Sequence, residues 1–222
     1  MATLIGPILL GLWGWLMLWS TWSGRLALLL RGVFHPVVGV TGMLLIMLAV
    51  ILLFPRFRQN RKRIPLAWSL SSLLAIFSLL FPPDPSFSEL AANRPGSNFY
   101  QSPRLTFYLP PEQRTLMEWV FILNSQPDPY LHNGAPVRIK GFVLDRSDET
   151  PMIARLMVRC CLADATPVGL HVQWPEGVVP KKDEWLEIEG IMAVHELNGN
   201  LFNVVQPKDI RNIPRPKNPL EL

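Results

Sequence analysis

The sequence contains only two cysteines, Cys160 and Cys161, and no acidic residue before Asp84. Two cysteines are too few for a network of structural disulfides, so this pair has to be judged from its own surroundings. The stretch from Met1 to Pro83 carries seven Lys and Arg residues, whereas the remainder carries 14 basic and 17 acidic residues. The net charge of +4 therefore belongs to the amino-terminal part of the chain and does not indicate a basic domain.

The part without acidic residues contains three long apolar runs. The first, Leu4 to Trp22, is uncharged and long enough to cross a hydrocarbon core of about 30 Å. It lacks the basic start and the small-residue cleavage site of a secretory signal, so it predicts an uncleaved helix. Val37 to Phe54 forms the second run and Ile64 to Pro82 the third. The sequence therefore predicts a transmembrane anchor of three helices in residues 1–83, surrounded by the lipid bilayer.

Basic residues in the loops orient these helices. The loop between the first two runs has only Arg25 and Arg31, whereas the loop between the second and third runs has Arg56, Arg58, Arg61, Lys62 and Arg63. The positive-inside rule places the loop with five charges in the cytoplasm. We therefore expect a multi-pass protein of the plasma (inner) membrane, with a cytoplasmic amino terminus and an extracytoplasmic carboxyl-terminal domain.

The predicted helices carry no acidic residue, Lys or Arg near mid-membrane, and ion pathways usually need such a group. The anchor alone is therefore not a transporter. His35 is the one ionisable residue between Gly32 and Phe54, and Pro36 follows it. Proline suits the first turn of a helix, so the simplest interpretation is that these two residues begin the second helix. The alternative is that His35 contacts a ligand or partner at the membrane surface.

Residues 84–134 are predicted as an extracytoplasmic linker with one short helix. Asp84 to Arg104 is rich in Pro, Ser and Asn. From Gln113 to Leu123, apolar residues recur at helical spacing after Pro111 and Glu112, which suit a first turn. This amphipathic helix is expected to pack on the domain that follows or to lie on the bilayer surface.

The spacing changes to strand-like alternation from Ala135 onward. Gly141 and Gly190 interrupt strands where a small barrel needs sharp bends, and Asn198-Gly199 is a strong hairpin signal. The sequence therefore predicts an all-β, OB-like five-stranded barrel in residues 135–213, followed by a Pro-rich tail in residues 214–222. The five predicted strands run from Val137 to Val143, Ile153 to Cys161, Leu170 to Trp174, Trp185 to Val194 and Leu201 to Val205.

OB barrels often bind single-stranded nucleic acid through basic grooves. Four basic residues could form such a stripe here: Arg138, Lys140, Arg155 and Arg159. Residues 135–213 nevertheless hold nine basic against eleven acidic residues, and the predicted topology places them outside the cytoplasm. We therefore expect no nucleic-acid partner.

Three interpretations compete for Cys160 and Cys161. Free cysteines are often buried in a core. A disulfide between neighbours would be strained, because adjacent Cα atoms are about 3.8 Å apart, against roughly 4.4–6.8 Å in ordinary disulfides. The third interpretation is a site for a thiophilic or borderline cation such as zinc, completed by Asp164 and by His171 or His195. It requires a turn, because strand alternation would send the two side chains to opposite faces.

Several of these residues together resemble a known family. The chain is similar to the YcgQ-type proteins, also called DUF1980, and the Cys-Cys-x-x-Asp-Ala string is the most specific part of the likeness. This chain departs from the family at its end, where Asn218-Pro219-Leu220 replaces Asn-Pro-Tyr. The likeness rests on His35-Pro36, Gly141-Phe142-Val143, the run from Arg155 to Ala165, Trp185 and Gly190.

The resemblance implies a permease subunit that pairs with a separate, many-spanning YcgR/YraQ-like permease, which itself resembles arsenical efflux permeases. It also implies a connection with metal homeostasis, and it favours functional roles for His35, Cys160, Cys161 and Asp164. We therefore expect a non-enzymatic accessory subunit. The alternatives are an envelope thiol-redox protein that uses the two cysteines and a purely structural anchor.

Overall fold

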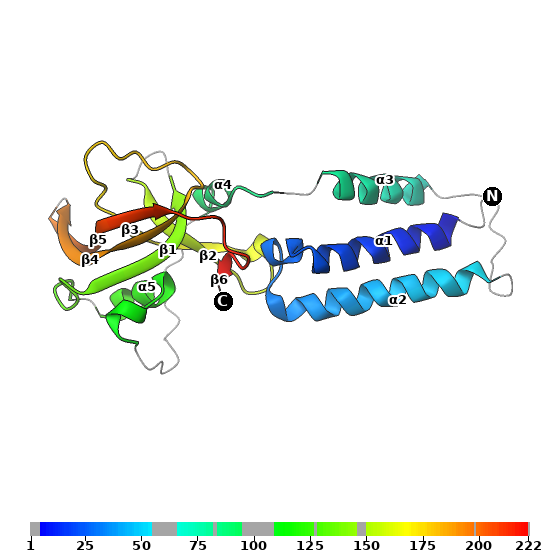
Figure 1. Cartoon of the computed structure of the whole chain (residues 1–222), viewed down its shortest axis with the longest axis horizontal. Helices are drawn as coiled ribbons and strands as arrows, with labels where there is room; N and C mark the ends of the chain where they lie inside the picture. The colour runs from blue at the N-terminus through cyan, green and yellow to red at the C-terminus, as the bar shows by residue number, and fades with distance from the viewer. Residues whose placement is uncertain are drawn as a thin grey trace. The chain divides into compact units, whose positions relative to one another are not determined.

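The computed structural model describes residues 5–54, 66–81, 84–94, 109–126, 128–145, 150–197 and 199–221. The chain divides into two compact units. The helical unit comprises Met1–Pro85 and Cys160–Leu162, and the sheet unit comprises Ser86–Arg159 and Ala163–Leu222. Figure 1 labels the helices and strands of both.

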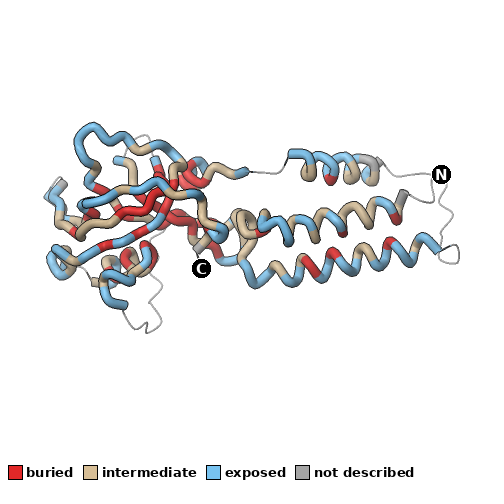
Figure 2. The backbone as a smooth tube through the Cα atoms, viewed as in Figure 1, coloured by how far each residue is buried: buried red, intermediate tan, exposed pale blue. Residues whose placement is uncertain are grey.

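The helical unit has a helix in each of the three apolar runs: α1 (Ile5–Trp22), α2 (His35–Leu53) and α3 (Leu66–Leu80). Among the described residues, one helical stretch, Gly32–Leu53, is long and apolar enough to cross a membrane. Most of α2 and α3 is exposed or half-buried in Figure 2, although their side chains are apolar. The loop with five basic charges lies outside the described residues, so its predicted orientation stays a prediction.

Helices α1 and α2 pack closely at a pair of glycines. A Cβ atom on Gly14 would lie 2.8 Å from the Gly42 carbonyl oxygen, and one on Gly42 would lie 3.0 Å from the Gly14 carbonyl oxygen. Only glycine permits this approach of the two backbones, which is the kind of contact that small residues make between membrane helices. Helix α3 is joined to α1 by a hydrogen bond of 2.9 Å, which the Trp13 indole donates to Ser71 Oγ.

Two short 3₁₀ helices, Arg25–Leu28 and Gly32–Phe34, connect α1 to α2. Gly24 begins the connection with a φ angle of 74°, a conformation that glycine adopts readily. Pro36 lies in the first turn of α2, as predicted for a residue that has no N–H to donate. The segment Leu29–Arg31 lies between the two 3₁₀ helices and pairs with Cys160–Leu162.

The sheet unit contains the five predicted strands: β1 (Pro136–Leu144), β2 (Met152–Met157), β3 (Thr166–His171), β4 (Trp185–Leu197) and β5 (Asn200–Asn212). They form an antiparallel sheet in the order β3-β2-β1-β4-β5. A parallel bridge between Val172 and Val205 joins the chain just after β3 to β5. A short sixth strand, β6 (Leu220–Glu221), was not predicted and pairs in parallel with β2.

Several of the predicted strand limits are wrong, including the end of the fifth strand, which was predicted at Val205 and lies at Asn212. Strand β2 ends at Met157 rather than at Cys161, because Met157 pairs with Thr166 and the chain between them has to reverse direction. Strand β3 begins at Thr166, whereas alternation predicted a start at Leu170. It leaves the ladder after His171, because β2 begins at the residue opposite, Met152.

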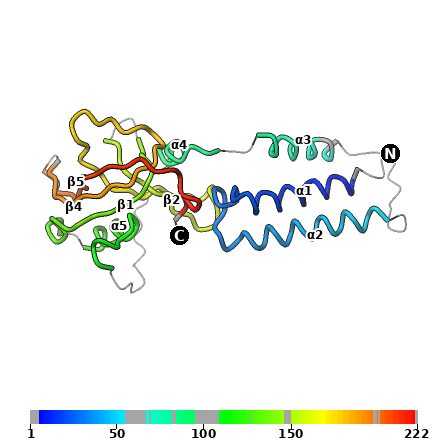
Figure 3. Tube along the Cα trace, viewed as in Figure 1, coloured from blue at the N-terminus to red at the C-terminus, as the bar shows by residue number. Residues whose placement is uncertain are grey.

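Both glycines lie where a neighbouring strand approaches closely, and a predicted irregularity is present at Gly190. A Cβ atom on Gly141 would be 2.6 Å from the Ala154 carbonyl oxygen, and one on Gly190 only 2.1 Å from that of Gln206. The β4–β5 register shifts between Glu189 and Gly190, which is a β-bulge. Figure 3 traces these two long strands as a curved ribbon. The hairpin prediction is also confirmed, with Gly199 at a φ angle of 80° in the turn.

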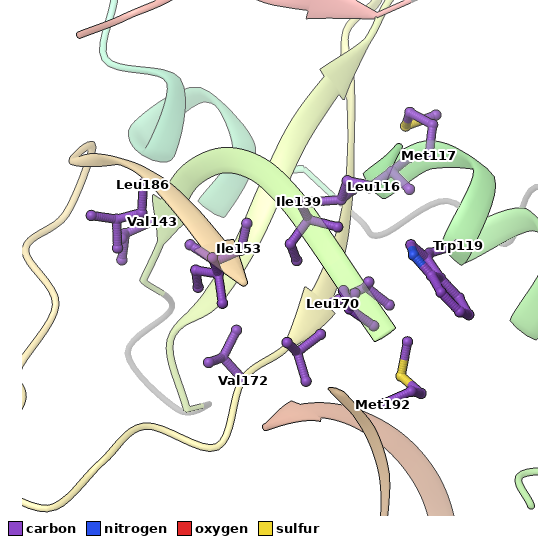
Figure 4. Packing of buried hydrophobic residues seen from close by; sticks show 14 of the residues in the cluster. Leu116, Met117, Trp119, Ile139, Val143, Ile153, Leu170, Val172, Leu186 and Met192 are labelled. Carbon is purple, nitrogen blue, oxygen red and sulfur yellow. The ribbon is translucent and has the colours of Figure 1, made fainter. Parts of the chain in front are cut away.

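Helix α5 (Leu116–Ser125) begins with a capping box, in which Thr115 Oγ1 accepts from the Glu118 N–H and the Glu118 carboxylate accepts from the Thr115 N–H. Its apolar face packs on the sheet, which confirms the first of the two predicted placements. Figure 4 shows Leu116, Met117 and Trp119 of the helix beside core residues of the strands.

Helix α4 (Phe87–Ala92) was not predicted and lies within the stretch expected to be linker. Ser86 caps it by accepting a hydrogen bond from the Glu89 N–H. Phe87 is fully buried, with its ring 5.8 Å from that of Phe142 and 6.1 Å from that of Trp185. This part of the expected linker therefore belongs to the core of the sheet unit.

Candidate functional site

The two cysteines lie in the bend between β2 and β3, and neither forms a disulfide. Cys160 is exposed and Cys161 is partly exposed, so the interpretation as core residues is wrong. Their Sγ atoms are 3.5 Å apart, which is a thiol–thiol contact and well beyond the length of about 2.05 Å for a disulfide bond. The bend thus brings both thiols to one side, as a shared site requires.

Asp164 joins the two thiols in the same bend. It ends a single 3₁₀ turn, Leu162–Asp164, which folds the chain back toward the cysteines. Its Oδ1 accepts a hydrogen bond of 3.0 Å from the Arg159 N–H, and this bond fixes the carboxylate. One ligand atom from each of Cys160, Cys161 and Asp164 lies within 4.8 Å of the others. The predicted Cys-Cys-x-x-Asp group is therefore present in space as well as in sequence.

The geometry of the group fits a zinc-like ion. A tetrahedral ion with Zn–S bonds of about 2.3 Å holds two sulfurs roughly 3.8 Å apart. The observed separation of 3.5 Å is within a few tenths of an ångström of that value. Two thiolates and one carboxylate are ligands that zinc accepts, and three protein ligands leave a fourth position open.

The structure does not bring the predicted histidine ligands to this group. His171 pairs with Met152 at the end of β3 opposite Thr166, which is roughly 17 Å of extended chain away. His195 lies on β4 directly across from Phe202. The rings of His171 and His195 both pack edge-on against Phe202, with centroids 5.8 and 5.7 Å away, so a packing contact accounts for them.

His35 reaches the cysteine segment through the backbone. Its Nε2 lies 3.1 Å from the carbonyl oxygen of Leu30. Leu30 forms an antiparallel bridge with Cys161, flanked by hydrogen bonds from the Arg31 N–H to the Cys160 oxygen and from the Leu162 N–H to the Leu29 oxygen. Sequence reasoning missed this segment, because residues 29–31 are the end of an ordinary leucine-rich stretch without a chemical signal.

The basic residues on the sheet are largely engaged with acidic neighbours. Arg138 Nε lies 2.9 Å and Lys140 Nζ 3.3 Å from the Glu187 carboxylate, and Arg211 bonds Glu189 at 3.0 Å. Burial raises the pKa of Glu187, but the hydrogen bonds from Arg138 and Lys140 together outweigh burial, so the pKa lies below its usual value. Arg155 is buried, 5.0 Å from the Trp185 ring centroid. Arg138, Lys140 and Arg211 therefore belong to a network of mixed charge with Glu187 and Glu189.

Comparison with known proteins agrees with the resemblance read from the sequence. No curated protein matches the chain, and no solved structure matches it. A family profile described as the DUF1980 C-terminal domain matches residues 110–220, which include α5, all five long strands and the Cys-Cys-Asp group. This chain therefore belongs to the DUF1980 family.

Proposed function

We propose that the chain is an integral membrane accessory subunit of a permease and that Cys160, Cys161 and Asp164 bind a thiophilic or borderline cation such as zinc. The observation that carries the proposal is the convergence of two thiols and a carboxylate within 4.8 Å on one exposed bend. The same three residues form the most specific part of the family likeness. The role is binding and delivery of an ion rather than catalysis.

The coordination chemistry of the group suits delivery. Four protein ligands hold zinc in a closed structural site, whereas three leave a position for an incoming ligand. A partner can then take the ion by donating a ligand at that position. Binding releases protons, because thiols must ionise before they bind a metal, so affinity falls as the pH is lowered.

The membrane and permease parts of the proposal rest on the helical unit. The stretch Gly32–Leu53 has the length and composition of a membrane-crossing helix. Helices α2 and α3 also expose large apolar side chains, including Met43, Leu73 and Phe77. Lipid or the apolar helices of a multi-spanning partner would cover such side chains. The family resemblance favours a YcgR/YraQ-like permease as that partner.

The sheet unit is best described as an OB-like barrel. In that barrel the first strand pairs with the second and the fourth, and the third and fifth strands meet in parallel to close the sheet. The order β3-β2-β1-β4-β5 and the parallel bridge between Val172 and Val205 support this description. Helix α5 contributes Trp119 and Ile122 to the core beside the strands.

Metal titration of the full chain tests the ion site. We expect the reduced protein in mild detergent to bind Co²⁺ with a thiolate-to-cobalt charge-transfer band, and Zn²⁺ to displace the cobalt. The double variant Cys160→Ser/Cys161→Ser should lose the band, and Asp164→Asn should weaken binding. Asp128→Asn is the matched control, because Asp128 also accepts a local backbone hydrogen bond, from the Tyr130 N–H.

Unchanged zinc affinity in the double cysteine variant would contradict the metal site. The accessory role has its own test, which is co-purification of the chain with its permease from native membranes. A monodisperse, unpartnered chain in membranes that contain the expressed permease would contradict that role while leaving the metal result intact.

The Sγ separation of 3.5 Å also favours a second candidate, thiol–disulfide exchange. In this reaction a disulfide between Cys160 and Cys161 is reduced to two thiols while two thiols of a substrate protein are oxidised to a disulfide, so electrons and protons balance. A disulfide between neighbours is strained and easily reduced, which favours this direction of exchange. Thiol–disulfide exchange activity that Cys160→Ser abolishes, in a chain without zinc affinity, would favour this candidate over the metal site.

A further inference from the structure

The carbonyl oxygen of Leu30 contacts His35, and the geometry of the bridge between Leu30 and Cys161 explains why. In an antiparallel pair of the non-hydrogen-bonded type, the N–H and C=O groups of the two opposed residues point away from each other. Leu30 and Cys161 form such a pair, because the flanking residues make the cross-strand hydrogen bonds. The Leu30 oxygen therefore points away from the cysteine segment and toward His35 Nε2, 3.1 Å away.

The polarity of this contact is fixed by its acceptor. A carbonyl oxygen can only accept a hydrogen bond, so His35 Nε2 must carry the proton. His35 is also the first residue of α2, and Pro36 restricts the backbone there. The donor is thus held by the end of a 19-residue helix rather than by a loop.

We propose that His35 is a positioning residue for the ion site, which acts through Leu30 to hold Leu29–Arg31 against Cys160–Leu162. This inference rests on the proposed metal function, and it adds that the start of α2 controls how firmly the site holds its ion. The bridge between Leu30 and Cys161 is isolated, with a single backbone hydrogen bond on each side of it, so it has little strength of its own. The hydrogen bond from His35 restrains Leu29–Arg31, so this segment separates less readily from the cysteine segment.

The coupling is reciprocal by thermodynamic necessity. If the His35–Leu30 hydrogen bond favours the ion-binding arrangement of Cys160 and Cys161, then a bound ion favours that hydrogen bond to the same degree. A partner that moves the start of α2 would thereby weaken the hold on the ion. His35 itself makes no contact with the ion in this scheme.

Three variants separate positioning from general structure. His35→Leu keeps a side chain of similar size but removes the hydrogen-bond donor. His35→Gln supplies an amide N–H donor in a position close to that of Nε2. His195→Leu is the matched control, because His195 is an exposed histidine on β4 that packs only on Phe202 among the contacts described. All three are made in the full chain in mild detergent.

Hydrogen exchange of the metal-free chain provides the first readout. The Arg31 and Leu162 amides donate across the bridge, so their protection reports its opening. We expect His35→Leu to speed the exchange of both amides by roughly two- to tenfold, the equivalent of one net hydrogen bond. His35→Gln and His195→Leu should match the wild type. Unchanged protection in His35→Leu would overturn the positioning role without reference to any metal.

Cobalt and zinc titration provides the second readout. We expect His35→Leu to weaken binding by a similar factor, His35→Gln to restore it, and zinc to protect the Arg31 and Leu162 amides in the wild type. If the wild-type chain binds zinc and His35→Leu binds it with the same affinity, the positioning role of His35 is overturned while the proposed function stands. Failure of the wild-type chain to bind zinc overturns the proposed function and, with it, the control by His35.

Discussion

At the scale of single residues, His132 shows how surroundings set a charge state. Its ring lies edge-on to the Trp119 indole, with centroids 5.7 Å apart, and its Nε2 lies 2.6 Å from Gln126 Oε1. Burial first, and the nearby Arg114 charge second, lower the pKa of His132 below its usual value. The folded chain therefore resists protonation at this position more than the unfolded chain does.

The lowered pKa predicts a loss of stability in acid. The unfolded chain takes up a proton at His132 near pH 6.5, before the folded chain does, so stability is complete above that pH and falls as the pH drops toward the folded pKa. We expect the Tm of the sheet unit to decrease between about pH 7 and pH 5. His132→Gln should flatten this dependence. An identical slope in His132→Gln would contradict the assignment.

Residue types predicted the Cys-Cys-Asp group better than they predicted a further ligand for it. The adjacency of Cys160 and Cys161, with a turn and Asp164 after them, was sufficient to place three ligand atoms together. His171 was predicted as a ligand because it is close to Asp164 in sequence, but the extended strand β3 carries it away from the cysteines. The link from His35 to the cysteines was beyond sequence reasoning, since it passes through Leu30, which pairs with Cys161 about 130 positions further along the chain.

At the scale of elements, the crossing of α1 and α2 depends on two glycines whose missing side chains are equivalent in effect. Each would place a Cβ atom against the other helix's carbonyl oxygen. Gly39, also on α2, has no atom within 4 Å of the position of its Cβ and provides an internal comparison.

We expect Gly14→Ala and Gly42→Ala to destabilise the α1–α2 pair by roughly 1–3 kcal/mol, the usual effect of overpacking. Gly39→Ala should be neutral or slightly stabilising, because alanine has the higher helix propensity. The measurement is the SDS mole fraction at which near-UV circular dichroism of the detergent-solubilised chain is lost. Equal midpoints for Gly14→Ala and Gly39→Ala would contradict the close crossing.

Helix α4 provides the second prediction at this scale. Phe87→Ala should destabilise the sheet unit by about 3–5 kcal/mol, because it empties a fully buried ring site between Phe142 and Trp185. Hydrogen exchange of the β1 amides measures the effect. Phe81→Ala, at an exposed phenylalanine after α3, is the control and should leave that protection unchanged. A wild-type exchange rate in Phe87→Ala would show that α4 does not contribute to the core.

The elements that sequence reasoning missed are short. Helix α4 has six residues, too few for a helical period to emerge from the surrounding Pro and Ser. Strand β6 has two residues and exists only because β2 offers an edge. By contrast, β1 and β4 follow from alternation, and only the part of β5 up to Val205 was predicted. Helix α5 follows from its spacing, although it begins at Leu116 and the predicted first turn, Pro111 and Glu112, belongs to a separate 3₁₀ helix, Pro111–Gln113. Strands β2 and β3 are as short as α4 but were predicted, because alternating apolar residues mark a strand within fewer residues than a helical period needs.

At the scale of the whole molecule, the orientation in the membrane is the open prediction. The charge difference between the two loops of the anchor places residues 56–63 in the cytoplasm and the sheet unit outside. A reporter active only outside the cytoplasm should work when fused after Leu222 and fail when inserted between Arg56 and Arg63. The reverse pattern would place the cysteines in the reducing cytoplasm and contradict an extracytoplasmic ion site.

The extent of pairing along β4 limits where homologous chains can differ in length. Up to Ile191, β4 is paired with β1 as well as with β5, so one inserted residue would reverse the faces of a paired strand on both sides. Beyond Ile191, pairing continues between β4 and β5 toward the turn at Gly199. Insertions and deletions during evolution should therefore gather in this distal ribbon and come in matched pairs that preserve the alternation of faces, while the part paired with β1 keeps a constant length.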